Sequence, residues 1–383
     1  MNVLDQISTV PASWPPLKFP IPPDAPAAPI SIYQVQLNSW MRVPEENYRP
    51  LAYGEIAPKL AAHAAEARFT HVQLIAPDNT DVSGFKFLVE TLHRGNLGVI
   101  VETPSLARPT QDPALYDLGD GLSVDGETVL HEHHYHWDLA WPDEMAAYFS
   151  TDPLYRKYRQ HQFVQRDQYA FTANYILPLS QRLASRLGKS LLSLMPGDPW
   201  RQFANLRLLF AYQFALPGKK LIFMGNEFGQ PNAWRPDSSL DWHLLQANSF
   251  HGKLLKWVTH LNRFYGEEGA LHQTDSRAAG FQWVDTSDAT CSVISLLRKS
   301  EATNETLLVV LNFTPVPRQN YRVGVPMGGL WREALNSDAL EFGGSGQGNL
   351  GGVEAAPFGW NSQSHSLTLT LPPLGAIFLK ASL

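Results

Sequence analysis

The densest group of side chains that could do chemistry lies at residues 131–136, where four of the 13 histidines stand beside Glu132 and Tyr135. Imidazole rings that alternate along a strand share one face and could bind a metal ion such as zinc or copper. A zinc-protease pattern would need a histidine at position 135, where this chain has a tyrosine. We therefore expect a solvated or locally hydrogen-bonded loop, with no bound metal ion and no cofactor.

Two further chemistries can be judged from residue types. The glycine-rich segment 341–353 lacks the Gly-Lys-Ser/Thr sequence of a phosphate-binding loop. The single cysteine, Cys291, excludes an intramolecular disulfide, a thiolate zinc site and an iron–sulfur cluster. Because it opens the apolar run 291–297, we predict that Cys291 is a small buried residue of a β-strand.

Acidic and basic residues nearly balance, with 36 Asp and Glu against 30 Lys and Arg and a net charge of −6. The basic residues form no cluster of the kind that nucleic-acid binding requires. No run approaches the length of about 18 apolar residues that a membrane span needs, and the N-terminal segment lacks the pattern of a signal peptide. We therefore expect a cytoplasmic protein with neither nucleic acid nor membrane as a partner.

Aromatic residues make up 11% of the chain, with 11 Trp and 13 Tyr among them. Such residues either fill large cores or form platforms on which the C–H faces of sugar rings stack. Composition alone leaves both explanations open.

The order of apolar runs predicts the elements that must position these groups. Short strand-like runs alternate with helical stretches between residues 31 and 270, which is typical of a parallel sheet with crossover helices. From 271 to 383 the chain changes to short strands separated by turn residues, which favours an antiparallel β-sandwich. Residues 1–30 form a proline-rich lead-in. The predicted strands of the first unit are 31–37, 70–77, 97–103, 134–141, 173–180 and 219–228.

A family resemblance becomes specific at residues 195–245. The segments MPGDPWRQFANLRLLFAYQFALPGKKLIFMGNEFGQ and WRPDSSLDWHLL strongly resemble the last barrel strand and following loop of bacterial glycogen (1,4-α-glucan) branching enzymes, which are α-amylase superfamily members of glycoside hydrolase family 13. The earlier runs SIYQVQLNSW, FTHVQLIAP and GNLGVIVETPS resemble the first three barrel strands. The runs HWDLAW, NYILPLS and KKLIFMGNEF resemble strands six, seven and eight, and SLTLTLPPLGAIFL resembles part of the C-terminal sandwich.

The resemblance implies a barrel of eight βα units, with catalytic groups at the carboxyl ends of its strands. It also implies retaining chemistry with a carboxylate nucleophile, a carboxylic acid and a third carboxylate that stabilises the oxocarbenium-like sugar. In this family an α-1,4 chain is cut, held on the enzyme and passed to a 6-hydroxyl group during glycogen biosynthesis.

The family motifs that carry this chemistry are altered here. The family's seventh strand ends in Leu-Ser-His-Asp-Glu, whereas here Gln181 and Arg182 follow Leu-Ser. A guanidinium group at the aspartate position would repel the positive charge that develops on the sugar. The third strand ends at Glu102 and lacks the histidine that the family has five residues later.

The chain is also too short between its third and sixth barrel strands. Glu102 and Tyr135 are 33 residues apart, and a single βα unit followed by its next strand takes about 30 residues. Strands four and five, on which the family carries its nucleophile and acid, cannot both be present. We therefore predict a shortened TIM-type barrel that lacks about two βα units, followed by the sandwich. Because exposed parallel edges favour pairing, a homodimer is among the expected states.

Asp125 can be aligned in two ways. The run from Asp120 to Gly126 echoes the family's nucleophile motif, with Ser123 in place of the arginine that fixes the carboxylate. Alternatively, residues 125–133 match the family's loop after strand three, which fits the available length better. In the second alignment Asp125 has no catalytic role, so no catalytic residue is assigned firmly.

Three residues of the carboxyl-end loops are candidate substrate contacts, namely Trp40, Glu227 and Trp234. Glu227 follows the eighth strand, where it could bind sugar hydroxyl groups or anchor the next loop. The two indoles could stack on sugar rings or support the architecture.

We expect a branching-enzyme homologue without catalytic activity that binds α-glucan, glycogen or another glycogen enzyme. The alternative is an active 1,4-α-glucan branching or transglycosylating enzyme with a site rebuilt around Asp125, Glu127 and Glu132. A decayed gene product with no selected role is the third hypothesis.

Overall fold

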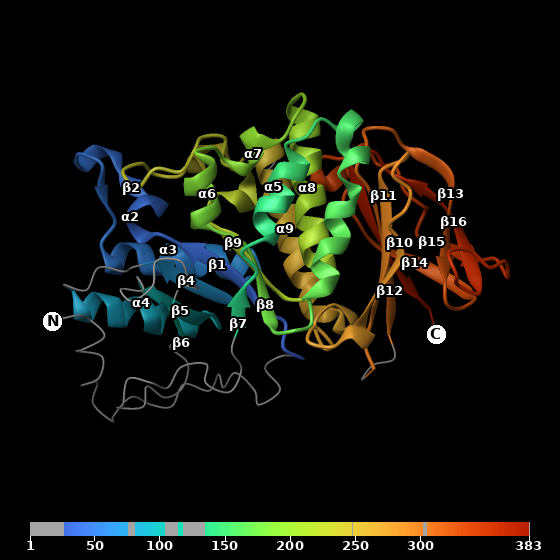
Figure 1. Ribbon diagram of the computed structural model, residues 1–383. Coiled ribbons are helices and arrows are strands. Elements are labelled where there is room, and N and C mark those ends of the chain that lie inside the picture. Colours follow the sequence, from blue (N-terminus) through green and yellow to red (C-terminus); the bar gives the residue numbers. More distant parts are fainter. Residues whose placement is uncertain are drawn as a thin grey trace.

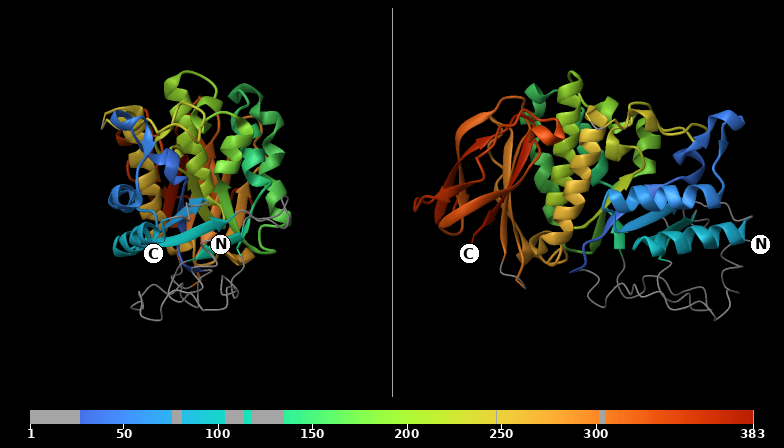
Figure 2. Two further views of the ribbon diagram at one scale, coloured as in Figure 1. Left: turned by 90° about the vertical axis from the view of Figure 1, so that its left-hand side faces the viewer. Right: turned by 180° about the vertical axis from the view of Figure 1, so that it is seen from behind.

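The computed structural model describes residues 27–75, 81–103, 114–117, 135–246, 248–301 and 305–382. The chain forms three layers, with a parallel sheet at one end, helices in the middle and an antiparallel β unit at the other end (Figures 1 and 2). None of the described helices combines the length and apolar composition needed to cross a membrane.

Six parallel strands form an open sheet in the order β5-β4-β1-β9-β8-β7, and β6 pairs antiparallel with β5 at one edge. Counted as barrel strands, this order is three, two, one, eight, seven and six, so β5 and β7 lie at opposite ends of the sheet. The prediction of a shortened barrel is thereby confirmed. The strands are β1 (Ser31–Val35), β4 (His71–Ile75), β5 (Gly98–Thr103), β6 (Ala114–Asp117), β7 (Tyr135–Trp137), β8 (Asn174–Leu179) and β9 (Lys219–Phe223).

Helices cover one face of this sheet, as they cover the outside of a closed barrel. Local sequence sets where several of them begin, because an Asp or Ser side chain accepts from a backbone N–H of the first turn. Asp81 caps α4, Asp198 caps α8 ahead of Pro199, and Ser249 caps α9. The helices are α2 (Leu37–Trp40), α3 (Tyr53–Glu66), α4 (Val82–Arg94), α5 (Trp141–Phe149), α6 (Gln181–Leu187), α7 (Leu191–Leu194), α8 (Pro199–Ala215) and α9 (Phe250–Glu267).

The opposite face of the sheet carries a small apolar cluster and a polar row. Ile32, Ile100 and Leu221 belong to that cluster. Two residues further along β1 the same face carries Gln34, whose neighbour in register on β4 is Gln73. The face that would line the interior of a closed barrel therefore becomes polar toward the carboxyl ends of its strands.

Helix α8 is buried along almost its whole length, from Phe203 to Ala215. A helix that is buried on all sides must have partners on all sides. Here the parallel sheet and the C-terminal sheet enclose it, and α9 packs beside it (Figure 1). The Arg207 guanidinium of α8 donates to the Ser337 carbonyl oxygen of the C-terminal unit at 2.8 Å.

The C-terminal unit consists of a six-stranded antiparallel sheet and a separate strand pair. Its strands bury a second apolar core that includes Leu308, Trp331 and Leu369, as expected for a sandwich. The six strands are β10 (Phe281–Asp285), β11 (Val293–Lys299), β12 (Thr306–Asn312), β14 (Gly329–Asn336), β15 (Gly352–Ala355) and β17 (Gly375–Ala381); β13 (Arg318–Val325) and β16 (His365–Leu371) form the pair. The prediction for Cys291 was wrong, because it lies half-buried in the turn before β11.

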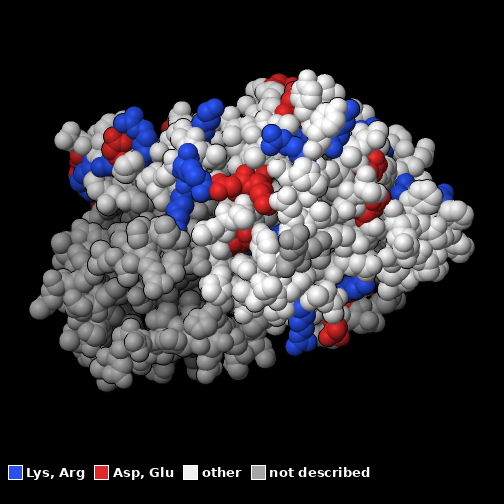
Figure 3. Space-filling model, in the orientation of Figure 1, with Lys and Arg blue, Asp and Glu red and all other residues white. Residues whose placement is uncertain are grey.

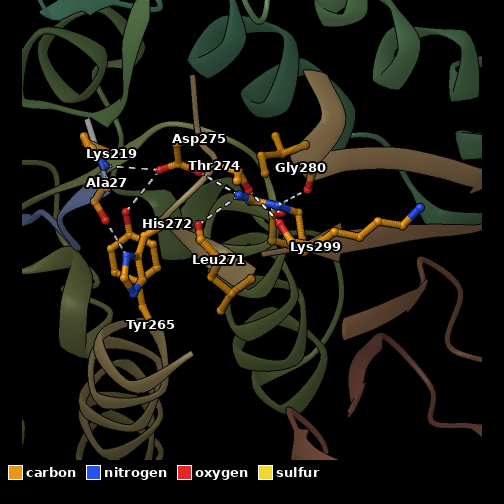
Figure 4. A network of polar contacts seen from close by, with 12 residues as sticks. Ala27, Lys219, Tyr265, Leu271, His272, Thr274, Asp275, Gly280 and Lys299 are labelled. Carbon is orange, nitrogen blue, oxygen red and sulfur yellow. Dashed lines mark hydrogen bonds and ion pairs between the residues drawn. The ribbon is translucent and has the colours of Figure 1, made fainter. Parts of the chain in front are cut away.

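A buried charge network joins the amino end of the parallel sheet to the C-terminal unit (Figure 4). Asp275 contacts Lys219 of β9 at 3.4 Å and Arg298 of β11 at 2.7 Å. Burial alone would raise the pKa of the Asp275 carboxyl, but the two cations outweigh burial and lower it. Lys219 also donates to the Ala28 carbonyl oxygen at 2.7 Å, so the lead-in before β1 is held by the same network.

We predict that Asp275→Asn destabilises the protein. The substitution leaves two buried cations without their carboxylate, which typically costs about 3–5 kcal/mol. Denaturant unfolding should show this loss, and Asp237→Asn, which alters an exposed pair with Arg235, should leave the unfolding midpoint unchanged. Equal midpoints for both variants would contradict a structural role for the network.

Stability should fall with acid because of His71, which packs against Gly98. Burial lowers the pKa of His71 to about 4, whereas an unfolded histidine titrates near about 6.5. Between these pH values the unfolded chain binds a proton that the folded chain does not bind. The free energy of unfolding therefore decreases as the pH falls from about 6.5 through about 4. His71→Gln should show a shallower loss of unfolding free energy over this range than the wild type and than His243→Gln, which changes an exposed histidine. Parallel curves for the three proteins would refute the assignment.

Candidate functional site

The carboxyl ends of the parallel strands are the place to look for a site, because this edge carries function in parallel barrels. The loops after β1, β8 and β9 meet there and hold most of the residues singled out in the sequence. Among the described residues, three carboxylates lie at or shortly after the ends of these strands, namely Glu102 on β5, Asp138 after β7 and Glu227 after β9.

Glu102 is held by two glutamine side chains. Its Oε2 accepts from Gln34 Nε2 at 3.0 Å and from Gln73 Nε2 at 2.7 Å. Burial raises the pKa of Glu102, against the opposing effect of these two donors and of the Arg182 charge. The side-chain Oε1 of Gln34 in turn accepts from the backbone N–H of Gln181 at 2.8 Å, which ties the start of α6 to β1.

Arg182 stands in the first turn of α6 and is exposed. Its guanidinium lies 5.7 Å from the centre of the Trp137 ring, in the geometry of a cation–π contact. A positive charge therefore occupies the strand end at which the resembled enzymes carry an aspartate. Gln181 beside it bonds Ser185 of its own helix at 2.8 Å.

Glu227 is fully buried. Its Oε1 accepts from the Tyr33 hydroxyl at 2.8 Å and lies 3.2 Å from His63 Nε2. Trp40 Nε1 donates to the same Tyr33 oxygen at 3.1 Å, and burial raises the pKa of Tyr33, which keeps its hydroxyl protonated. The side chains of these four residues form a cage that holds the loop after β9 against α3. A sugar contact by Glu227 stays a prediction.

The two indoles predicted as sugar contacts take part in the same packing. Trp40 is 1% exposed and its ring centre lies 4.6 Å from that of Trp242, whose Nε1 donates to the Trp40 carbonyl oxygen at 2.7 Å. Trp234 is half-buried and donates to Ser39 Oγ at 3.0 Å. These contacts join the loops after β1 and β9, and a stacking role for either ring likewise stays a prediction.

Asp138 was not predicted from the sequence to be a site residue. This buried carboxylate accepts from Arg166 Nε at 2.8 Å and from the Tyr169 hydroxyl at 3.1 Å. It also accepts from the backbone N–H of Trp141 at 3.1 Å and so fixes the start of α5. The sequence does show an aspartate directly after a short strand. Its side-chain partners Arg166 and Tyr169, however, lie 28 and 31 residues further along the chain, in a segment without a motif.

Asp125 and the histidines at 131, 133 and 134 lie outside the described residues, so both alignments of Asp125 stay open. Within the described ranges, no three His, Cys, Asp or Glu side chains gather as a metal site would require. On the face seen in Figure 3, basic and acidic side chains lie in small mixed groups.

Comparison with known proteins gives consistent matches. Residues 283–382 match the family model "Alpha amylase, C-terminal all-beta domain". The 1,4-alpha-glucan branching enzyme of Aquifex aeolicus is 36% identical, with 92% of this chain and 76% of that protein covered. The branching enzyme of Albidiferax ferrireducens is 48% identical over 72% of this chain and 42% of its own length. The crystal structure of an alpha-amylase from H. orenii is 12% identical and superposes with a TM-score of 0.59, over 92% of this chain and 99% of that one, which shows a shared fold.

The Aquifex alignment also indicates that this chain is shorter than that enzyme within the matched region. It extends over 483 positions, 100 more than the 383 residues of this chain. The relative therefore carries at least that many residues inside the matched region that have no counterpart here. A deletion of this size agrees with the short connection between β5 and β7.

We predict that Tyr33→Phe destabilises the loop cage. The change leaves Glu227 and Trp40 without a shared partner, and an unsatisfied buried polar group costs about 1–3 kcal/mol. Thermal unfolding should show a lower midpoint. Tyr158→Phe removes a hydroxyl from a ring that is 69% exposed and should leave the midpoint unchanged; an unchanged midpoint for Tyr33→Phe as well would argue against the cage.

Proposed function

Because this chain belongs to the bacterial 1,4-α-glucan branching enzyme family, we propose that it binds the α-glucan of glycogen and does not branch it. The single observation that carries this proposal is the open parallel sheet, in which β5 and β7 are the outermost parallel strands at opposite ends. The family carries its nucleophile and its acid on the two barrel strands that would stand between them.

The carboxylates at the strand ends support loss of catalysis. Retaining glycosidases need two carboxyl groups about 5–5.5 Å apart, with one free to attack and the other free to protonate. Here Glu102, Asp138 and Glu227 are each engaged by their own donors on three different strands. Engaged in this way, they serve the packing of the loops.

Arg182 supports the same conclusion from electrostatics. An oxocarbenium-like transition state needs a negative charge nearby, and electrostatic stabilisation is usually the largest single contribution to catalysis. A guanidinium in its place raises the energy of the cationic sugar. Groups that act as a unit lose most of their effect when one is removed.

Two considerations support glucan binding by this protein. The relatives at 36% and 48% identity are named for action on 1,4-alpha-glucan. Binding of a neutral polysaccharide also needs aromatic faces and hydrogen-bonding side chains, and it does not depend on a nucleophile.

We predict no change in the iodine spectrum of amylose incubated with this protein near stoichiometric concentration. Branching shortens the linear chains and shifts the band to lower wavelength, as the Aquifex enzyme should show in parallel. A shift lost in Asp125→Ala would reveal an active enzyme with a rebuilt site and would overturn the proposal.

The double substitution Gln181→His with Arg182→Asp restores the family residues after β8. We expect this variant to remain inactive in the same assay, because the strands that carry the nucleophile and the acid are still missing. Recovery of activity would mean that Gln181 and Arg182 together suppress an otherwise complete site.

A further inference from the structure

An open groove lies on the C-terminal unit. This unit stands at the end of the molecule opposite the parallel sheet (Figure 1). It is bounded by the end of β10, by the bulged start of β13 and by the hairpin at residues 358–363. Its volume is about 710 Å³, which lies within the range of about 300–1,000 Å³ of small-molecule sites.

Two aromatic side chains of this region are exposed, in contrast to the buried indoles described above: Trp360 lines the groove, and Phe358 lies beside Arg322 of its lining. Trp360 is 44% exposed and Phe358 is 55% exposed. The indole N–H of Trp360 makes no hydrogen bond to any described residue. Large exposed rings cost free energy in water unless a ligand covers them, and sugar rings present the apolar C–H faces that do so.

Arg322 of β13 lies beside both rings. Its guanidinium carbon is 4.9 Å from the centre of Phe358 and 5.9 Å from that of Trp360. No side-chain hydrogen bond or ion pair links Arg322 to another described residue, so its five N–H donors face solvent or a ligand. These two cation–π contacts place the guanidinium donors beside the aromatic surface.

Hydrogen bonds to residues at the groove hold the hairpin that carries Trp360 in place. Asn361 and Ser362 have φ of 47° and 59°, the left-handed values of a tight two-residue turn. Asn361 Nδ2 donates to Asp285 Oδ2 at 2.9 Å, and its Oδ1 accepts from the Gly324 N–H at 3.1 Å. The Trp360 carbonyl oxygen would lie 2.0 Å from a Cβ on Gly324, so only glycine allows this approach. The groove is therefore preformed.

Charge around the groove indicates what kind of ligand it fits. The residues that line the groove include two carboxylates, Asp285 and Asp288, and two arginines, Arg318 and Arg322. Asp288 Oδ2 also accepts a hydrogen bond from the Tyr321 hydroxyl at 2.7 Å. A balanced lining of donors and acceptors beside exposed rings suits an uncharged molecule rich in hydroxyl groups.

We infer that this groove binds an α-1,4-glucan chain, with a glucose ring stacked on Trp360 and its hydroxyl groups bonded by Arg322 and the neighbouring carboxylates. The inference rests on the proposed function for the choice of glucan. It assigns glucan binding to the C-terminal unit, remote from the edge at which the family does its chemistry.

The test compares variants in native gels that contain glycogen and in calorimetric titrations with maltoheptaose. Trp360→Ala should weaken binding at least about tenfold, as truncation of a central aromatic contact does. Phe87→Ala is the matched control, because Phe87 is also exposed and also carries an arginine, Arg94, over its ring. The control should bind like the wild type, and all variants should keep the wild-type unfolding midpoint.

A second pair of variants tests the groove without removing a ring. Gly324→Ala should displace the hairpin and weaken binding similarly, whereas Gly54→Ala, whose Cβ would meet nothing within 4 Å, should not. If the wild type binds and Trp360→Ala and Gly324→Ala bind equally well, the groove is refuted while the proposed function stands. If the wild type binds neither glycogen nor maltoheptaose, the proposed function fails, and the assignment of glucan to the groove fails with it. A groove that takes a protein partner instead would give this second result.

Discussion

A parallel barrel closes when its first and last parallel strands are joined through the strands between them, and here the outermost parallel strands are β5, which carries β6 on its outer side, and β7. The shortened connection between them removes the strands that would bridge the gap. An open parallel sheet cannot be stable alone, because parallel sheets are normally buried on both faces. The rest of the molecule can be understood as the consequence of this missing closure.

Stability comes from the layer behind the sheet. Helix α8 is buried between the two sheets, and the Asp275 network fastens β9, β11 and the lead-in to one another. At the carboxyl edge, side chains of the kind that other barrels use on substrates hold loops together, as the Glu227 cage does. Under the proposed loss of catalysis, these carboxylates do not have to stay available to a substrate and can serve packing.

The sequence predicts the strands well because alternation of apolar runs and helices is a local pattern. It also predicts the shortened barrel, since a count of residues between Glu102 and Tyr135 leaves no room for two βα units, but it does not predict whether the remaining strands close. It does not predict the Asp275 network, whose members come from segments far apart in the chain, nor the partners of Asp138. Composition could not separate buried Trp40 from exposed Trp360, because exposure depends on the strand pair and the hairpin that present the ring. Cys291 was misplaced because the apolar run that it opens begins two residues before strand β11 does.

The central claim is that the nucleophile of the family has been lost. Intact-protein mass spectrometry after incubation with a fluorinated α-glucosyl fluoride tests it directly, since retaining enzymes trap such reagents as a covalent ester on their nucleophile. The account predicts an unchanged protein mass. An added glycosyl mass that maps to a carboxylate, Asp125 above all, would contradict it.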